Sequence, residues 1–260
     1  MLSYQHIFHA GNLADVHKHG LMAWVLAYLT QKDKPLSYLE THAGRGLYRL
    51  DAPEAVKTGE AAAGIGRVAD WFGADHPYRR VRDLVVAEHG PAAYPGSPML
   101  AAILLRDMDS LMLAELHPQE FAALDEVMKG RGIRLEHRDG IELALAVTPP
   151  EPRRGVMLID PSWEVKTDYE TVPRAIVSVA RKWPVGIIAL WYPILVDGRH
   201  KRMLRALSEV FPEALASEVR FPPHREGHGM IGSGMFFVNP PWGLEAEAKS
   251  LAAKFKKLGG

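Results

Sequence analysis

Residues 156–163 read Val-Met-Leu-Ile-Asp-Pro-Ser-Trp, an apolar run that ends in a carboxylate, a proline and an aromatic ring. A continuous apolar run of this length is typical of a strand buried on both faces, as in a parallel sheet. Similar runs lie at 37–41, 111–115, 134–137 and 186–191, and each precedes a turn and a helix-like segment. The repetition predicts βαβ units and an α/β fold with a doubly wound, mostly parallel sheet.

The pattern differs near the two ends of the sequence. Residues 12–31 favour a helix with Asn12 or Asp15 as its N-cap. Beyond residue 207, the runs 216–221 and 235–239 flank a stretch rich in proline, histidine and glycine, which predicts an antiparallel hairpin closing one edge of the sheet. Residues 244–258 favour a final amphipathic helix.

Residues 42–110 separate the first two predicted strands, far more than the dozen or two that a crossover requires. Helical patterns at 60–71 and 79–88 indicate a small inserted helical subdomain over residues 51–93. Tyr-Pro-Gly-Ser-Pro at 94–98 is the turn that returns the chain. We expect residues 1–50 and 94–260 to form the main domain.

Composition excludes several kinds of chemistry. The 260-residue sequence has no cysteine, which removes disulfides, iron–sulfur clusters and thiol nucleophiles. The apolar run at 20–30 is shorter than a membrane-spanning helix, and no charged leader precedes it, so we expect a cytoplasmic protein without a membrane partner. The net charge of zero does not favour a nucleic-acid partner, although basic clusters at 153–154, 199–202 and 224–225 could form one basic face.

Three strand ends carry residues suited to a nucleoside, because open α/β sheets bind ligands outside the carboxyl ends of their strands. The first is followed by a glycine-containing loop at 40–46, which would let a ligand approach the backbone. The second ends in Glu115, which can accept both hydroxyls of a ribose, and the third precedes Asp139 and Gly140, which could read the amino edge of an adenine. Taken singly these are ordinary turns and helix caps. Together they predict a site for NAD or S-adenosylmethionine.

The fourth strand end distinguishes the two cofactors. Asp160, Pro161, Ser162 and Trp163 resemble the Asp-Pro-Pro-aromatic motif of amino methyltransferases, with serine in place of the second proline. An exocyclic amine is a poor nucleophile because its lone pair is delocalised into the ring. The Asp160 carboxylate and the Pro161 carbonyl could accept hydrogen bonds from both amino hydrogens and stabilise the developing charge. Trp163 could stack on the extracted base. The structural alternative is a strand-ending turn with a core tryptophan.

Longer segments give a more specific resemblance. They are Met1-Leu2-Ser3-Tyr4-Gln5-His6, Phe8-His9-Ala10-Gly11-Asn12, Ala14-Asp15-Val16, Lys18-His19, Thr41-His42-Ala43-Gly44, Tyr94-Pro95-Gly96-Ser97-Pro98, Glu115-Leu116-His117-Pro118, Asp160-Pro161, Leu190-Trp191-Tyr192-Pro193 and Asn239-Pro240-Pro241-Trp242. With these segments the sequence resembles the RlmJ family, which methylates N6 of an adenine in 23S ribosomal RNA.

The resemblance implies a Rossmann-like fold that binds S-adenosylmethionine and carries an inserted helical subdomain. It implies that Asp160 is the catalytic residue and that Tyr4 lies near the substrate adenine. It further implies a cofactor site formed by Lys18 or His19, His42, Ser97, Glu115, Asp139 with Gly140, and Asp160.

Three alternatives remain open. His6, His9, His17 and His19 lie close in sequence and could suggest zinc. His17 and His19 are two apart on a predicted helix and face different ways, so we expect no metal, and we expect His6 and His9 to hold the N-terminal loop by hydrogen bonds. An NAD-dependent oxidoreductase, or an RNA-binding module with an inactive cofactor site, are the rival classes. We expect a monomer whose partner is 23S ribosomal RNA.

Overall fold

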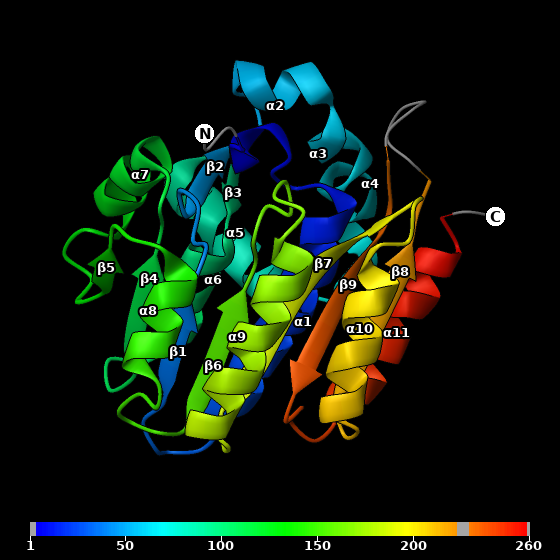
Figure 1. The fold of residues 1–260 in the computed structure, drawn as a ribbon. Helices are drawn as coiled ribbons and strands as arrows, with labels where there is room; N and C mark the ends of the chain where they lie inside the picture. Colours follow the sequence, from blue (N-terminus) through cyan, green and yellow to red (C-terminus); the bar gives the residue numbers. More distant parts are fainter. Residues whose placement is uncertain (1–3, 223–228, 259–260) are drawn as a thin grey trace.

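In the computed structural model, which describes residues 4–222 and 229–258, seven strands form one sheet in the order β5-β4-β1-β6-β7-β9-β8 (Figure 1). The parallel strands are β1 (Ser37–Glu40), β4 (Ser110–Ala114), β5 (Arg134–Glu136), β6 (Gly155–Ile159) and β7 (Ile187–Leu195). The strands β8 (Leu215–Arg220) and β9 (Met230–Val238) are antiparallel to their neighbours. The predicted parallel sheet and its antiparallel hairpin are therefore confirmed.

The strand order places a crevice beside β1. The chain passes from β1 outward to β4 and β5 and then returns to β6 on the other side of β1. At such a reversal the connections leave toward opposite faces of the sheet, which opens a crevice at the carboxyl ends of the two central strands. This crevice lies between the ends of β1 and β6.

Helices cover both faces of the sheet (Figure 1). On one face the core includes α1 (Leu13–Thr30), α5 (Pro77–His89), α6 (Ser97–Leu104), α7 (Pro118–Met128) and α11 (Leu244–Lys256). On the other face it includes α8 (Gly140–Val147), α9 (Asp168–Lys182) and α10 (His200–Val210). None of the helices in the described part of the chain is long and apolar enough to cross a bilayer.

Successive residues of the central strands point to opposite faces. In β6, Val156 and Leu158 pack with α1, whereas Met157 and Ile159 pack with α9. This two-sided burial explains why the run is apolar throughout rather than alternating. Asp160 follows Ile159 and therefore lies on the α1 side of the sheet.

The inserted segment is helical, as predicted, but it differs in detail. It contains α2 (Pro53–Thr58), α3 (Glu60–Ala63), α4 (Ile65–Val68) and the 3-10 helix η2 (Ala69–Trp71), and it is framed by an antiparallel pair, β2 (Leu47–Arg49) and β3 (Ala93–Pro95). The helix expected over 60–71 is broken at Gly64, where a Cβ would overlap the carbonyl of Gly11. Because α5 shares the core of α1, the division at residues 51–93 stays a prediction.

Candidate functional site

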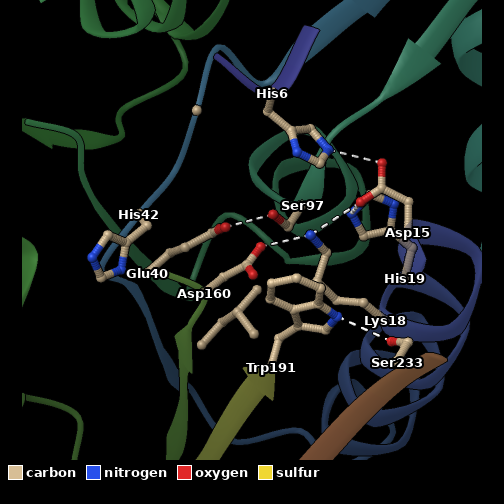
Figure 2. Close-up of polar contacts among 12 residues, drawn as sticks. His6, Asp15, Lys18, His19, Glu40, His42, Ser97, Asp160, Trp191 and Ser233 are labelled. Atoms are coloured by element: carbon tan, nitrogen blue, oxygen red, sulfur yellow. Dashed lines mark hydrogen bonds and ion pairs between the residues drawn. The ribbon is translucent and has the colours of Figure 1, made fainter. Parts of the chain in front are cut away.

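Side chains from α1, β1, β6 and the start of α6 converge at the crevice (Figure 2). The Lys18 Nζ lies 2.6 Å from Asp160 Oδ2 and 3.1 Å from Asp15 Oδ1. Burial alone would lower the pKa of Lys18, but the carboxylates of Asp160 and Asp15 outweigh burial and raise it. Lys18 is therefore a buried ammonium that joins the end of β6 to α1.

Asp15 is the centre of this cluster, and sequence reasoning considered it only as a helix cap. Its Oδ2 accepts from the Gly11 backbone N–H and lies 2.9 Å from His6 Nε2. Burial would raise the pKa of Asp15, but the nearby His6, Lys18 and His19 hold it well below its usual range. The spacing of Asp15 and Lys18, three residues apart on one helix, could have predicted that the two side chains are paired.

The N-terminal segment is held over the crevice by hydrogen bonds. The Tyr4 hydroxyl lies 2.9 Å from His6 Nδ1, and His9 Nδ1 lies 2.9 Å from Glu60 Oε1. Burial and the nearby Asp160 raise the pKa of Tyr4. Tyr4, His6, Asp15, Lys18 and Asp160 thus form one continuous polar chain. The first three residues of the sequence lie outside the described residues.

His17 and His19 face different ways, as expected. His19 Nδ1 lies 3.1 Å from the Tyr94 hydroxyl, whereas the His17 ring lies between Ser217 and Ser233. Burial lowers the pKa of each histidine to about 3. Across residues 4–222 and 229–258, no three potential metal-ligating side chains are grouped to hold an ion.

Glu115 organises the glycine loop that follows β1. Its carboxylate accepts from the backbone N–H of Gly44 and of His117, each at 2.7 Å. Burial raises the pKa of Glu115, and these amide donors partly oppose the effect. His42, in the same loop, lies 2.7 Å from Thr41 Oγ1, and burial lowers its pKa. The loop and the end of β4 are therefore locked together beside the crevice.

Ser97 is already engaged by a neighbour that sequence reasoning did not select. Its hydroxyl lies 2.5 Å from Glu40 Oε1, and the Tyr38 hydroxyl donates to Glu40 Oε2 at 2.8 Å. Burial raises the pKa of Glu40 to about 8. Glu40 is the last residue of β1, so its position at a strand end was a usable signal.

Asp139 and Gly140 have local structural roles at the start of α8. Asp139 is the N-cap, and its Oδ1 accepts from the Glu142 N–H at 2.8 Å. A Cβ at Gly140 would overlap the carbonyl of Thr41 at the end of β1. The pair therefore brings α8 close to β1, beside His42.

Trp163, which we expect to stack on the base, is packed into the core. Its indole is 5% exposed, packs against Tyr169 with ring centroids 4.6 Å apart, and donates to the Trp191 carbonyl at 3.1 Å. Its backbone is left-handed, with φ of 58°, a conformation that a bulky residue keeps only where packing holds it. Trp163 is a core residue here that fixes the turn after Asp160 and Pro161, and its stacking on the base stays a prediction.

The two basic clusters within the described residues lie at opposite ends of the sheet. Residues 199–202 lie where β7 ends, at the same end of the sheet as Asp160, whereas 153–154 precede β6 at the opposite end. Arg154 donates to the carbonyl of Lys34 there. The third cluster, 224–225, lies outside the described residues. Asn239 to Trp242 follow the antiparallel β9 and so also lie at the end opposite Asp160.

A mostly parallel sheet with a strand reversal between β1 and β6, and acids at the ends of β1, β4 and β6, define a Rossmann-like fold with a candidate cofactor site, and the family match identifies its class as a methyltransferase. The chain belongs to the RlmJ family, because the family model described as "Ribosomal RNA large subunit methyltransferase D, RlmJ" matches residues 33–258.

Named relatives agree with this assignment over nearly the whole chain. The chain is 42% identical to "Ribosomal RNA large subunit methyltransferase J" of Escherichia coli, covering 96% of this chain and 91% of the relative. The protein of the same name from Haemophilus influenzae is 39% identical, with 96% and 92% covered. A crystal structure of a Legionella pneumophila protein superposes with a TM-score of 0.87 at 34% identity, covering 96% of this chain and 94% of that one.

Proposed function

We propose that this protein transfers a methyl group from S-adenosylmethionine to the N6 amino group of an adenine in 23S ribosomal RNA. The large-subunit ribosomal RNA methyltransferases among its relatives support the class of substrate. The observation that carries the choice of atom is Asp160, a carboxylate at the end of β6 followed by the Pro161 carbonyl.

The acids around the crevice fit a positively charged cofactor. Glu115, Asp139 and Asp160 bring acidic side chains to the ends of β4, β5 and β6, whereas Glu40 at the end of β1, with its pKa raised to about 8, is mostly neutral. Arg45, the basic residue of the glycine loop, is engaged by Glu120 at 2.9 Å. This set opposes the pyrophosphate of NAD and suits a sulfonium compound, which would supply an activated methyl group when bound.

We assign the cofactor contacts to the residues around the glycine loop. Glu115 would hold the ribose hydroxyls, and Asp139 beside Gly140 would face the cofactor adenine. His42 and Ser97 would line the site between Glu115 and Asp139. Lys18 and His19 would contribute from α1. Since Glu115 and Ser97 already have protein partners, they are held in place before any ligand binds.

On the substrate side, Asp160 and the Pro161 carbonyl would accept from the two hydrogens of the adenine amino group. Both acceptors would orient the nitrogen and stabilise the positive charge that develops on it. The Lys18 ammonium holds Oδ2 of Asp160 and so fixes the direction of the carboxylate. Tyr4, joined to this cluster through His6, would contact the extruded base.

The test is Asp160→Asn in single-turnover methyl transfer to unmodified 23S RNA, with mass spectrometry of the digested nucleosides. The amide keeps the size of the side chain but presents an NH₂ group, and we expect the rate to fall by about 100- to 1,000-fold. Cofactor affinity should change little, and Lys18 keeps Asp15 as a partner. A near-wild-type rate, or wild-type methylation of another atom, would contradict the proposal.

Two cheaper measurements address the rival classes. A thermal shift with S-adenosylhomocysteine and none with NAD would exclude the oxidoreductase. Transfer of labelled methyl groups to RNA would exclude an RNA-binding module with an inactive cofactor site.

A further inference from the structure

Trp191 lies beside Asp160 on the neighbouring strand. Ile159 of β6 pairs with Leu190 of β7, so the next residues, Asp160 and Trp191, are level with each other on the α1 side of the sheet. The Lys18 Nζ lies 5.6 Å from the centroid of the Trp191 ring (Figure 2). The Trp191 carbonyl accepts a hydrogen bond from the Trp163 indole. Trp191 therefore contacts both the ammonium that holds Asp160 and the turn that follows it.

The orientation of this indole is set from the C-terminal hairpin. Trp191 Nε1 donates to Ser233 Oγ of β9 at 3.0 Å (Figure 2). The same hydroxyl lies 3.0 Å from His17 Nδ1, and His17 Nε2 lies 3.0 Å from Ser217 Oγ of β8. These four residues form an unbranched chain from β8 through α1 and β9 to β7.

Every nitrogen in this buried chain has a hydroxyl partner. An indole N–H can only donate, so the Ser233 oxygen is the acceptor that keeps it satisfied. The neutral imidazole of His17 has one donor and one acceptor, and one hydroxyl faces each nitrogen. The edge of the His17 ring also packs on Phe255 of α11, with centroids 5.9 Å apart. Removal of the Ser233 hydroxyl would leave a buried N–H without its partner.

We propose that Ser233 and His17 are positioning residues for the Asp160 site, because they fix the Trp191 indole and, through it, the Lys18 ammonium and the turn at 161–163. The inference rests on the proposed methyl transfer. It assigns a role in the reaction to the C-terminal hairpin, in which no residue was otherwise expected to act.

Ser217 provides a matched control for Ser233. Both serines are buried, at 6% and 0% exposed, and each lies 3.0 Å from a nitrogen of His17, but the contact with Trp191 belongs to Ser233. We expect S233A to lower the single-turnover rate by about 10- to 100-fold, the scale of a small misplacement of reacting groups, with a smaller change in the Kd of S-adenosylmethionine through Lys18. The single-turnover rate of S217A should stay within about two-fold of wild type. The melting temperature of S217A should nevertheless fall by about as much as that of S233A, because each variant loses one buried hydroxyl.

A double-mutant cycle gives the second readout. W191F keeps an aromatic ring above which Lys18 can lie but removes the N–H that Ser233 accepts. If both changes act through one hydrogen bond, W191F/S233A should be no slower than the slower single variant, whereas independent structural damage would multiply. If S233A does not fold, W191F removes the same hydrogen bond from its donor side. The single-turnover rate of W191F is then compared with that of S217A.

Equal rates for S233A and S217A, or fully multiplicative effects in the cycle, would overturn the inference. Absence of methyl transfer from the wild-type protein is a different result, which would overturn the proposed function and this role together.

Discussion

The Asp15 carboxylate has the buried Lys18, the partly buried His6 and a backbone N–H as its near partners. Its oxygens contact Lys18, His6 and the Gly11 N–H, and the side chain is 1% exposed. A buried charge is tolerated only when it is paired and hydrogen-bonded. The Lys18 ammonium contacts the carboxylates of Asp15 and Asp160 together. The charge at the end of β6 therefore depends on three residues rather than on Asp160 alone.

We expect Asp15→Asn to destabilise the fold by about 3 kcal/mol, because it removes one partner of a buried ion cluster. Urea unfolding measures the change. Asp83→Asn is the control: Asp83 pairs with Arg79 on the exposed face of α5, where removal of the partner costs less than about 1 kcal/mol. Equal destabilisation by the two variants would contradict the importance given to the Asp15 cluster.

Glu115→Ala tests the cofactor site. The change removes the proposed ribose acceptor and releases the Gly44 N–H, so cofactor binding should weaken by about 1.5 to 3 kcal/mol. Calorimetric titration with S-adenosylhomocysteine gives the affinity. A wild-type value would remove Glu115 from the site.

The residue types at strand ends were enough to select some of the candidate site residues. The others lie at the site because of contacts that form only in the folded chain. Asp160 and Glu115 could be selected because a parallel sheet collects its carboxyl ends at one edge. Asp15 could not be ranked above an ordinary cap, since its partners come from residues 6 and 18 in the folded state. A sequence motif does not tell which way an aromatic ring points, so the packing of Trp163 on Tyr169 could not be predicted.

At the scale of the element, α1 is unusual in being buried on nearly all sides. It packs on α5, α6, α11 and the sheet, and its buried residues include His17, Lys18 and His19. Residues 20–29 are apolar on every side of the helix, which is the pattern of a buried helix rather than of a surface helix with a polar face. The burial follows from its place between the sheet and the surrounding helices.

The neutral histidines of α1 predict a decrease of stability in acid. The pKa of His17 is about 3 in the folded protein and about 6.5 when unfolded, so the unfolded chain binds a proton first as the pH falls. The contribution of neutral His17 to the free energy of unfolding is complete above pH 6.5. It is lost as the pH falls toward 3, at up to about 1.4 kcal/mol per pH unit.

The effect of Glu40 on the free energy of unfolding has the opposite sign, because its pKa in the folded protein is raised to about 8. Protonation of Glu40 therefore stabilises the fold as the pH falls from 8 toward 4.5. The comparison of wild type with His17→Gln isolates the histidine. Between pH 7 and 5, the unfolding free energy of wild type should fall more steeply than that of the variant. Parallel pH profiles would show that His17 has the same pKa in the folded and unfolded chains, and would contradict this prediction.

Strand positions could be predicted from the apolar runs, whereas helix continuity in the insertion could not. The runs are long because both faces of β6 and β7 are buried. The break at Gly64 depends on the carbonyl of Gly11 lying against it, which is a contact between residues far apart in sequence. Local pattern carries no information about such an approach.

For the whole molecule, charge is divided between the two ends of the sheet. The exposed Lys201 and Arg202 begin α10 at the end that carries Asp160, and the exposed Lys32 and Lys34 precede β1 at the other end. An RNA that presents its adenine to Asp160 would lie near the first pair and away from the second.

We therefore expect K201Q/R202Q to lower RNA affinity and to reduce the log–log salt slope by roughly 0.7 to 0.9 for each phosphate that is no longer neutralised. K32Q/K34Q should match wild type in both quantities. Filter binding over a salt series makes the measurement. Equal effects of the two pairs would mean that RNA is not held at the catalytic end.

The position of α1 also has a consequence for synthesis. Every proposed site residue from Tyr4 to Trp191 is synthesised before β8, which begins at Leu215. Until β8, β9 and α11 follow, His17 lacks both hydroxyls and the ring of Phe255, and a helix with buried charges has no completed place to pack. A nascent chain stalled near residue 210 would therefore hold all the reacting groups without holding the site, and competence would appear only with the last strands.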